Sequence, residues 1–454
     1  MGVVFLCGSH CAHTQSILKH AGQPTRDCIR ASSGGAAAFS TKLSRAWGHF
    51  VKRGFVRYFG PALIVSVAYI DPGNFGTDIA GGASYAYDLL WVVWLASIMG
   101  IVLQYLSGKL GIATGQSLPE IIREKLKPKW KVIAYWLGCE TFAVFTDLAE
   151  FLGVALGLYL LFGIPLLFAA WAAAFDVVII FLLAGKNFRR IEMIVTTLVA
   201  VIGLGYVYEI FLTKPNVVQV ATHSFLPLIP NSAAGVVAVG IIGATVMPHA
   251  LAVHSWLARN KLVTGDREEK RKLLKFHRDE TIVVLGLAGL INGAILMMGA
   301  AAFNSRGIQV ATIQEAYRTL LPLFGFAAST VFAVTLLCSG LSSSTTSVLA
   351  GQSILEGLLG SHMNPWLRRI VIRVVNVIPT TLAITLGFNP LDLLVYSQVV
   401  LSLLIPLPLI PLLVFTMDRK LMGTMVNRRA TTAISLFFCG VILAFNAYLI
   451  LLLV

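Results

Sequence analysis

The chain has 454 residues, of which 57% are hydrophobic and 12% are charged. In soluble domains about a quarter of all residues are charged, so this composition excludes an ordinary soluble protein. It predicts an all-α polytopic membrane protein. The net charge of +14 could indicate nucleic-acid binding, but the basic residues gather in segments on one side of the predicted membrane. This distribution reflects membrane topology, and we expect no nucleic-acid partner.

The first 50 residues are polar and basic, without an apolar stretch long enough for a signal peptide. Cys7, His10, Cys11 and His13 are spaced as metal ligands can be. We interpret residues 1–50 instead as a disordered cytoplasmic extension. None of the six cysteines of the chain falls in a predicted outside loop, so no disulfide framework is expected.

Eleven apolar stretches follow, most of them long enough to cross roughly 30 Å of hydrocarbon as a helix. Most of the 35 Lys and Arg residues lie on one side of these stretches. The positive-inside rule therefore predicts a cytoplasmic N-terminus, an outside C-terminus and residence in the cell (inner) membrane. The predicted spans are 58–84, 89–112, 133–161, 165–184, 192–212, 234–258, 281–303, 325–356, 367–387, 390–416 and 431–454.

The first span contains the run Asp71-Pro72-Gly73-Asn74 in its middle. Proline and glycine interrupt a helix there, and a charged Asp at the centre of a span costs roughly 2.5 to 3.5 kcal/mol on insertion scales. Asp71 is thus expected to face a partner or a pathway. A proline that only kinks a packed helix is the alternative interpretation.

The third span carries three carboxylates, Glu140, Asp147 and Glu150. Seven residues make almost two helical turns, so Glu140 and Asp147 lie on one face, with Glu150 one turn beyond. Such a row predicts a proton relay or a cation path, with Arg373 in the ninth span as countercharge. A static buried ion pair that holds helices together is the alternative.

The sixth span has a second interruption, Met247-Pro248-His249. Oxygen donors from Asp71 and Asn74 alone would suit Mg²⁺ or Ca²⁺, whereas the thioether of Met247 favours softer ions such as Mn²⁺, Fe²⁺, Co²⁺ or Cd²⁺. Met247 could also simply fill space in the core. His249 could be a ligand or a proton carrier, and we favour the proton role.

The two interruptions are separated by five spans. Broken helices at matching positions of two five-helix halves predict an inverted-repeat transporter with its site near the middle of the membrane. The expected division is a first repeat at 51–212, a second at 234–416 and an additional eleventh helix at 431–454.

These motifs resemble the Nramp family of proton-coupled divalent metal-ion transporters, which share the LeuT-type fold, and the resemblance extends over about residues 50–454. The run at 71–74 and the run Ala-Thr-Val-Met-Pro-His at 244–249 are its most specific parts. Further matching motifs are Leu-Gly-Ile-Ala-Thr-Gly at 110–115, Asp-Leu-Ala-Glu at 147–150, Ala-Gly-Gln at 350–352, Glu-Gly at 356–357 and Ser-Gln-Val-Val-Leu-Ser at 397–402.

The resemblance implies which residues act. Its metal ligands are Asp71, Asn74 and Met247, with a backbone carbonyl of Ala68 or Ala244 and with Gln398 approaching in the occluded state. Its proton route is Asp71, His249, Asp147, Glu150 and Glu140, with Arg373 as cationic partner. The chain departs from the family pattern at Ala250, Ile372, Asn376 and Leu404, and Ile372 removes one charge from the expected network.

We therefore expect a secondary transporter, not an enzyme, that brings Mn²⁺ or Fe²⁺, together with Cd²⁺ and Co²⁺, into the cytoplasm by alternating access with proton transport. Its partners would be these ions, protons and the bilayer, with no resident cofactor, and it would act as a monomer. Two alternatives stay open. One is an organic-cation or amino-acid symporter of the same architecture, although a central Asp71 would repel a substrate carboxylate. The other is a membrane enzyme or receptor that binds metal without moving it.

Overall fold

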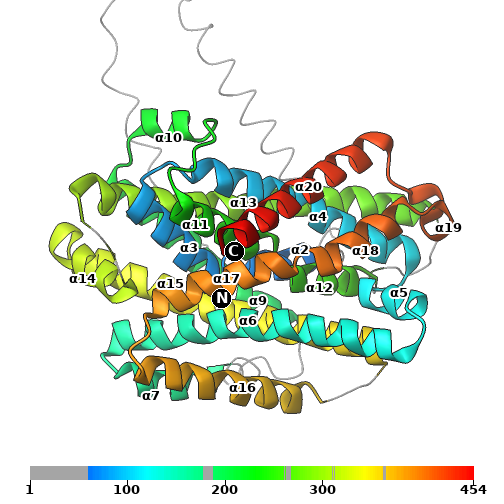
Figure 1. Ribbon diagram of the computed structural model, residues 1–454, viewed down its shortest axis with the longest axis horizontal. Helices are drawn as coiled ribbons and strands as arrows, with labels where there is room; N and C mark the ends of the chain where they lie inside the picture. Colours follow the sequence, from blue (N-terminus) through cyan, green and yellow to red (C-terminus); the bar gives the residue numbers. More distant parts are fainter. Residues whose placement is uncertain are drawn as a thin grey trace, which may run out of the picture. The chain divides into compact units, whose positions relative to one another are not determined.

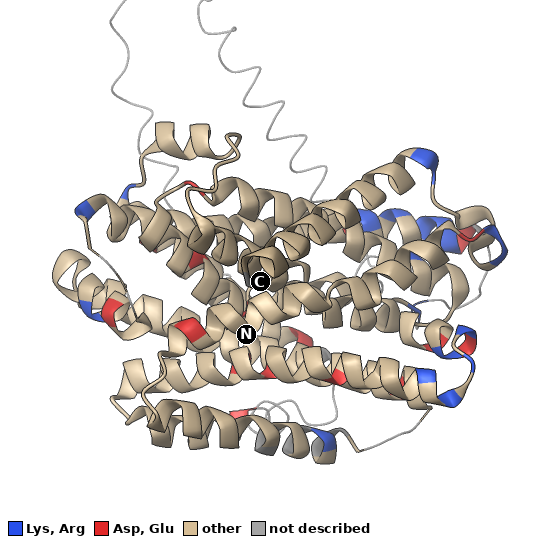
Figure 2. Ribbon diagram, in the orientation of Figure 1, with Lys and Arg blue, Asp and Glu red and all other residues tan. Residues whose placement is uncertain are grey.

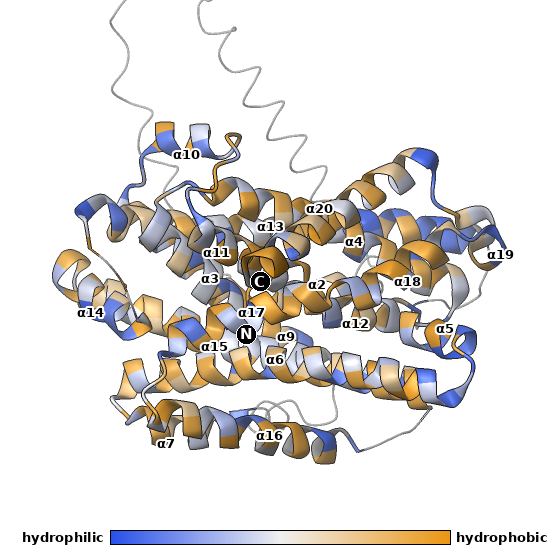
Figure 3. Cartoon of the chain, viewed as in Figure 1, coloured by the Kyte–Doolittle hydropathy of each residue, from blue (hydrophilic) through white to orange (hydrophobic). Residues whose placement is uncertain are grey.

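The computed structural model describes residues 60–176, 188–259, 261, 267–308, 310, 312–360 and 364–453. The predicted N-terminal extension lies outside these residues. The described part consists of helices and their connections, without a strand. Figure 1 shows this arrangement, and Figure 3 shows that apolar residues run along the long helices while hydrophilic ones gather at helix ends and connections.

Most of the described residues belong to helices. In chain order the helices are α2 (Pro61–Ala68), α3 (Pro72–Tyr85), α4 (Leu90–Thr114), α5 (Leu118–Lys125), α6 (Lys129–Phe162), α7 (Leu166–Ala173), α9 (Phe188–Thr213), α10 (Val217–His223), α11 (Ser232–Val246), α12 (Pro248–Arg259), α13 (Arg267–Ala302), η1 (Asn304–Arg306), α14 (Ile313–Phe324), α15 (Phe326–Leu359), α16 (Pro365–Thr385), α17 (Pro390–Leu404), α18 (Pro406–Met417), α19 (Arg419–Met422), η2 (Gly423–Met425) and α20 (Arg429–Leu453).

Eight helical segments of the described chain are long and apolar enough to cross a membrane. The difference from the eleven predicted spans has three sources. The first span is divided between α2 and α3, each too short to cross alone. The fourth, 165–184, runs into residues that are not described. The ninth corresponds to α16, of which only Val375–Thr385 qualifies, as a shorter apolar helix.

Both predicted helix breaks are present, and both are buried. The first separates α2 from α3, with Asp71 as the N-cap of α3, and the second separates α11 from α12 at Met247. In each case a proline occupies the first position of the following helix, where its missing N–H is tolerated and its fixed φ suits a helix start. Each break is therefore followed directly by a new helix that begins at the proline.

The broken helices lie among the longest helices of the chain. α3 packs against α13, α11 against α17, and α12 against α4, while α6 packs against α15 and also contacts α7 and α16 (Figure 1). Gly153 lets α6 approach the first break closely, because a Cβ at this position would overlap the ring of Pro72. The predicted carboxylate helix therefore adjoins the first break directly.

Gly82 in α3 has a similar role at the contact with α13. A Cβ at Gly82 would overlap the backbone carbonyl of Leu296 and lie 2.8 Å from the amide nitrogen of Ala300, whereas a Cβ at Gly81 would meet side-chain atoms no closer than 3.5 Å. Backbone atoms of a long helix cannot yield as the tip of a side chain can. The α3–α13 contact therefore requires glycine at position 82.

We predict that Gly82→Ala destabilises the protein by about 1 to 3 kcal/mol through overpacking. When the protein is heated in detergent and then run on a size-exclusion column, the monodisperse peak of this variant should disappear at a lower temperature than that of the parent. The neighbouring Gly81→Ala is the matched control. It should be neutral or stabilising, because alanine has the higher helix propensity by about 1 kcal/mol. Equal heat stability of the two variants would contradict the close α3–α13 contact.

Candidate functional site

The two prolines at the breaks leave two carbonyl groups without their usual helical partner. A helical carbonyl accepts from the N–H four residues later, and for Ala68 and Ala244 that residue is Pro72 and Pro248, respectively, which have no N–H. These are the two carbonyls that the family resemblance implies as ligands. Proline spacing alone was a signal that could have identified them.

Asn74 connects the two breaks. Its Nδ2 donates to the Asp71 Oδ1 at 2.9 Å and to the Ala244 carbonyl at 3.0 Å. Its Oδ1 accepts from the Thr245 hydroxyl at 3.0 Å and from Asn292 Nδ2 at 3.2 Å. The side chain is fully buried. One amide therefore ties the start of α3 to the end of α11 and to α13.

The side chains of Asp71 and Gln398 both lie close to the Cα of Gly73. A Cβ at Gly73 would lie 2.8 Å from the Asp71 Oδ2 and would overlap the amide group of Gln398. The Asp71 Oδ1 accepts from the Asn74 N–H at 2.8 Å, whereas the Asp71 Oδ2 and the Gln398 Oε1 are buried without a hydrogen bond from any described residue. Two unused oxygens thus gather at the first break.

Met247 is fully buried at the end of α11, three residues beyond Ala244, and belongs to the same apolar cluster as Ala68. Among the described residues, no group of three His, Cys, Asp or Glu side chains could hold a metal ion. A cation at this place would instead meet one carboxylate, amide and backbone oxygens and one thioether. This set has fewer charges than a typical zinc or calcium site and includes a soft donor.

The second group of candidate residues lines a small cavity beside the site. His249 is bonded through Nδ1 to the Thr146 hydroxyl, 3.2 Å away, and its Nε2 has no partner among the described residues. His249, Thr146 and Asp147 line this cavity together with Ser347 and Arg368. The cavity therefore lies between His249, next to the sixth-span break, and Asp147 of α6.

Two of these carboxylates accept hydrogen bonds from neutral donors. Asn376 of α16 donates from Nδ2 to the Asp147 Oδ2 at 2.7 Å, and the Ser347 hydroxyl of α15 donates to the Glu150 Oε1 at 2.5 Å. Asp147 and Glu150 are both 1% exposed. The predicted row on one face of α6 is therefore present, in contact with α15 and α16.

The third carboxylate, Glu140, has a partner that was not predicted from the sequence. The Nη2 atom of Arg368 lies 2.9 Å from the Glu140 Oε1 and 2.8 Å from the Glu140 Oε2. The predicted countercharge was Arg373, not Arg368. Arg368 is a buried residue of α16. Arg373 also belongs to α16, but its side chain lies outside the described part of the chain.

Other buried carboxylates were not predicted, and two of them have no hydrogen-bond partner among the described residues. Asp78 of α3 and Glu209 of α9 are fully buried, and none of their oxygens has a hydrogen bond from a described residue. An acidic residue within a predicted apolar span was the available signal for both. No comparable rule would have selected Thr245 or Asn292, whose importance depends on contacts across the fold.

Comparison with known proteins identifies the family of this chain. A family model described as natural resistance-associated macrophage protein-like (Nramp) matches residues 62–452. A relative from Deinococcus radiodurans, named divalent metal cation transporter MntH, is 43% identical over 91% of this chain and 94% of its own length.

Solved structures agree with this relationship. A crystal structure of the Eremococcus coleocola manganese transporter, in complex with an aromatic bis-isothiourea substituted compound, has a TM-score of 0.78 at 31% identity and covers 88% of this chain and 86% of that one. The nucleobase-cation-symport-1 family transporter Mhp1 has a TM-score of 0.59 at 15% identity, with 87% and 88% covered, which shows the shared fold alone. The predicted all-helical LeuT-type fold is confirmed, and the chain belongs to the Nramp family.

Proposed function

We propose that this chain imports divalent transition-metal ions, Mn²⁺ or Fe²⁺ first and Cd²⁺ or Co²⁺ as well, into the cytoplasm together with protons. The observation that carries the proposal is the buried convergence of Asp71, Asn74 and the Ala244 carbonyl, with Met247 adjoining, where two broken helices meet. The names of the relatives, a divalent metal cation transporter and a manganese transporter, support it.

The Asn74 amide suggests how a cation would enter. Its NH₂ group donates to the Asp71 carboxylate and to the Ala244 carbonyl, the two oxygen groups best suited to a cation. A bound ion would take over the role of this donor, and the amide would turn to present Oδ1 as a ligand. The hydroxyl of Thr245 can accept as well as donate, and the Asn292 Oδ1 has no described partner, so both can adapt to the turned amide.

Protons would leave the site by way of His249 and the cavity that Asp147 also lines, and would then pass toward Glu150. Glu140 with Arg368, and Arg373 as the predicted further partner, would supply the charges that line the remainder of this route. An inside-negative potential favours cation entry by about 2.3 kcal/mol per charge per 100 mV, which gives the direction of transport.

Topology and organisation belong to the same proposal. Figure 2 shows most Lys and Arg residues at one end of the helices, and by the positive-inside rule this end would be cytoplasmic. The N-terminus would be inside and the C-terminus outside, in the cell (inner) membrane. The repeats would be 51–212 and 234–416, with 431–454 added. The protein would act as a monomer.

The proposal is tested with purified protein in liposomes that contain a metal-sensitive dye and, in parallel, a pH-sensitive dye. We expect Mn²⁺-dependent quenching and internal acidification well above empty vesicles. A protein that binds Mn²⁺ in calorimetry but gives no quenching would be a receptor or enzyme. Calorimetric binding of an amino acid or organic cation without binding of Mn²⁺ would support the symporter alternative.

We predict that Met247→Ala retains Mn²⁺ uptake but lowers the preference for Mn²⁺ over Ca²⁺ by about tenfold, since the lost thioether is a donor that hard ions do not use. The measurement is competition between the two ions in the dye assay. Met99→Ala is the control, because Met99 is equally buried in a different apolar cluster and loses the same volume. Unchanged Ca²⁺ exclusion in Met247→Ala would remove Met247 as the selecting ligand.

We also predict that Asp147→Asn reduces metal-driven acidification by about tenfold and metal uptake by less, because an amide cannot relay a proton. Both signals are recorded in the same vesicles. Asp392→Asn, at an exposed position near the start of α17, should leave both signals unchanged. If uptake and acidification fall equally in Asp147→Asn, the carboxylate is structural and not part of the proton route.

A further inference from the structure

The short helix α5 links α4 to α6 and is seated on the end of α15. A Cβ at Gly357 would overlap the ring of Pro119, so the helix start lies directly on α15. The Arg123 guanidinium donates to the Glu356 carbonyl at 3.5 Å, near the end of α15. These contacts hold α5 with α15, which also carries Ser347 of the proposed proton route.

α5 begins with a capping box that fixes one of its carboxylates. Glu120 accepts from the Ser117 N–H at 2.7 Å and from its hydroxyl at 2.9 Å. In such a box the residue at the third helical position returns to the N-cap backbone, which orders the first turn. The carboxylate of Glu120 is therefore held in one place at the start of the helix.

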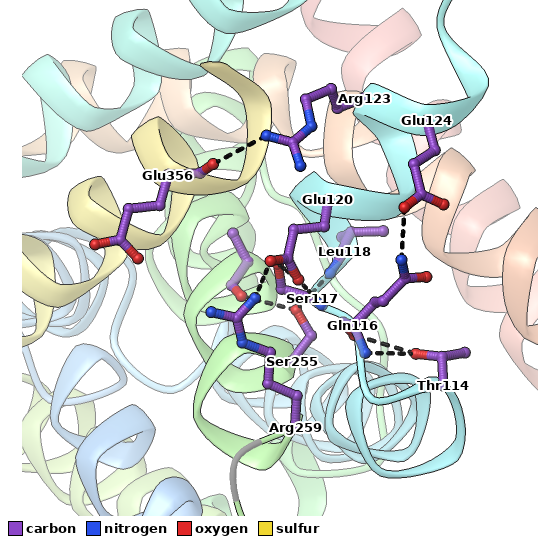
Figure 4. Close-up of polar contacts among 11 residues, drawn as sticks. Thr114, Gln116, Ser117, Leu118, Glu120, Arg123, Glu124, Ser255, Arg259 and Glu356 are labelled. Atoms are coloured by element: carbon purple, nitrogen blue, oxygen red, sulfur yellow. Dashed lines mark hydrogen bonds and ion pairs between the residues drawn. The ribbon is translucent and has the colours of Figure 1, made fainter. Parts of the chain in front are cut away.

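Two polar bonds join this end of α5 to α12. Arg259, the last residue of α12, forms an ion pair with Glu120, and the Leu118 N–H donates to the Ser255 hydroxyl at 2.9 Å (Figure 4). The ion-paired side chains are only 18% and 23% exposed, so solvent screens them less than a surface pair. Burial alone would raise the pKa of Glu120, but the bonds from Arg259 and Ser117 outweigh it and lower the pKa below its usual value. The pair is thus charged at neutral pH.

The position of α12 gives this pair its importance. α12 begins at the break beside Met247 and His249 and ends at Arg259, about 18 Å further along the helix. On its α4 side it is held through its backbone, because the Ser107 hydroxyl donates to the Leu251 carbonyl at 2.5 Å. On its α5 side it is held through Ser255 and Arg259, so a movement of α12 away from α5 would break both of these bonds.

We propose that the Glu120–Arg259 pair, assisted by Leu118 and Ser255, is a latch that holds α12 against α5 and keeps the binding site closed toward the cytoplasm. The inference rests on the proposed function, since a path to the cytoplasm is needed only if the ion is delivered there. Glu120 and Arg259 are positioning residues and touch no ligand of the cation. Opening the latch would free α12, the part of the sixth span that follows the break, while leaving Asp71, Asn74 and Met247 in place.

The test uses the full chain with its six native cysteines replaced by serine and with Val253→Cys as reporter. Val253 is fully buried in α12, which packs against α2, and it belongs to the same apolar cluster as Val65 and Ala68 of α2, so its labelling reports exposure of the buried face of α12. A membrane-impermeant thiol reagent is applied from the cytoplasmic side. Glu120→Gln and Arg259→Gln should each be labelled about fivefold faster, which matches a shift of roughly 1 kcal/mol in the opening equilibrium.

Several variants separate a latch from a general loss of stability. Glu120→Gln keeps the capping box, because glutamine also fills that position, and Arg259→Lys should label at nearly the rate of the parent. The double variant Glu120→Gln with Arg259→Gln should label no faster than either single one, since both remove the same interaction. Ser255→Ala, which removes the second bond, gives an independent route to faster labelling.

The matched control is Glu124→Gln on the same helix, whose carboxylate accepts from Gln116 at 2.6 Å within the α5 segment. It should not change the labelling rate. Equal rates in the Glu120 and Glu124 variants, or additive effects in the double variant, would overturn the latch. Calorimetry of Mn²⁺ binding separates the two proposals. A parent protein that does not bind Mn²⁺ contradicts the proposed function. A Glu120→Gln variant that binds Mn²⁺ like the parent and is labelled at the parent's rate contradicts the latch alone.

Discussion

Two helices that stop inside a membrane leave backbone groups without helical partners, and the structure depends on how these groups are satisfied. An unsatisfied amide or carbonyl in hydrocarbon costs several kcal/mol. Here Asn292 donates to the Tyr69 carbonyl at 2.9 Å, Ser339 to the Ile70 carbonyl at 2.7 Å, and Asn74 to the Ala244 carbonyl at 3.0 Å. Side chains from α13, α15 and α3 thereby replace the missing helical bonds. The helices that supply these hydrogen bonds to the breaks also surround the site. A substitution that changes the geometry of the site is therefore expected to change the stability of the fold as well.

In the proposed function this dependence would let the freed carbonyls serve a cation as well. A carbonyl inside a helix is committed to its own backbone, whereas the Ala244 carbonyl is satisfied by a side-chain amide that can turn away. The cost of leaving a buried carbonyl bare is removed if a cation replaces the departing donor. In this view the protein stays stable without cargo because Asn74 donates to both the Asp71 carboxylate and the Ala244 carbonyl, and binding would exchange a neutral hydrogen-bond donor for a cation.

The sequence predicted the elements of the site that depend on local rules. The breaks follow from Pro72 and Pro248, and the row on α6 follows from the spacing of its carboxylates. It did not predict the residues that contact these elements from elsewhere in the chain. Asn376 meets Asp147 across 229 positions, and Arg368 meets Glu140 across 228. Such pairs depend on which helices adjoin, which periodicity does not give. α5 was not predicted although Ser-Leu-Pro-Glu at 117–120 is a readable capping box, because a short polar segment between two long apolar spans resembles a loop.

The pairing of Glu140 with Arg368 also refines the proposed proton route. A carboxylate that neutralises a buried arginine cannot take up a proton without leaving that arginine unpaired, and breaking a buried pair in this way is strongly unfavourable. Asp147 accepts a hydrogen bond from Asn376 and Glu150 accepts one from Ser347, and both of these donors are neutral. In the proposed route Glu140 with Arg368 would therefore keep a fixed charge pair at the end of the row, and Asp147 and Glu150 would remain the candidates to carry the proton. Asn376 fits this division, because its amide holds Asp147 without contributing a charge of its own.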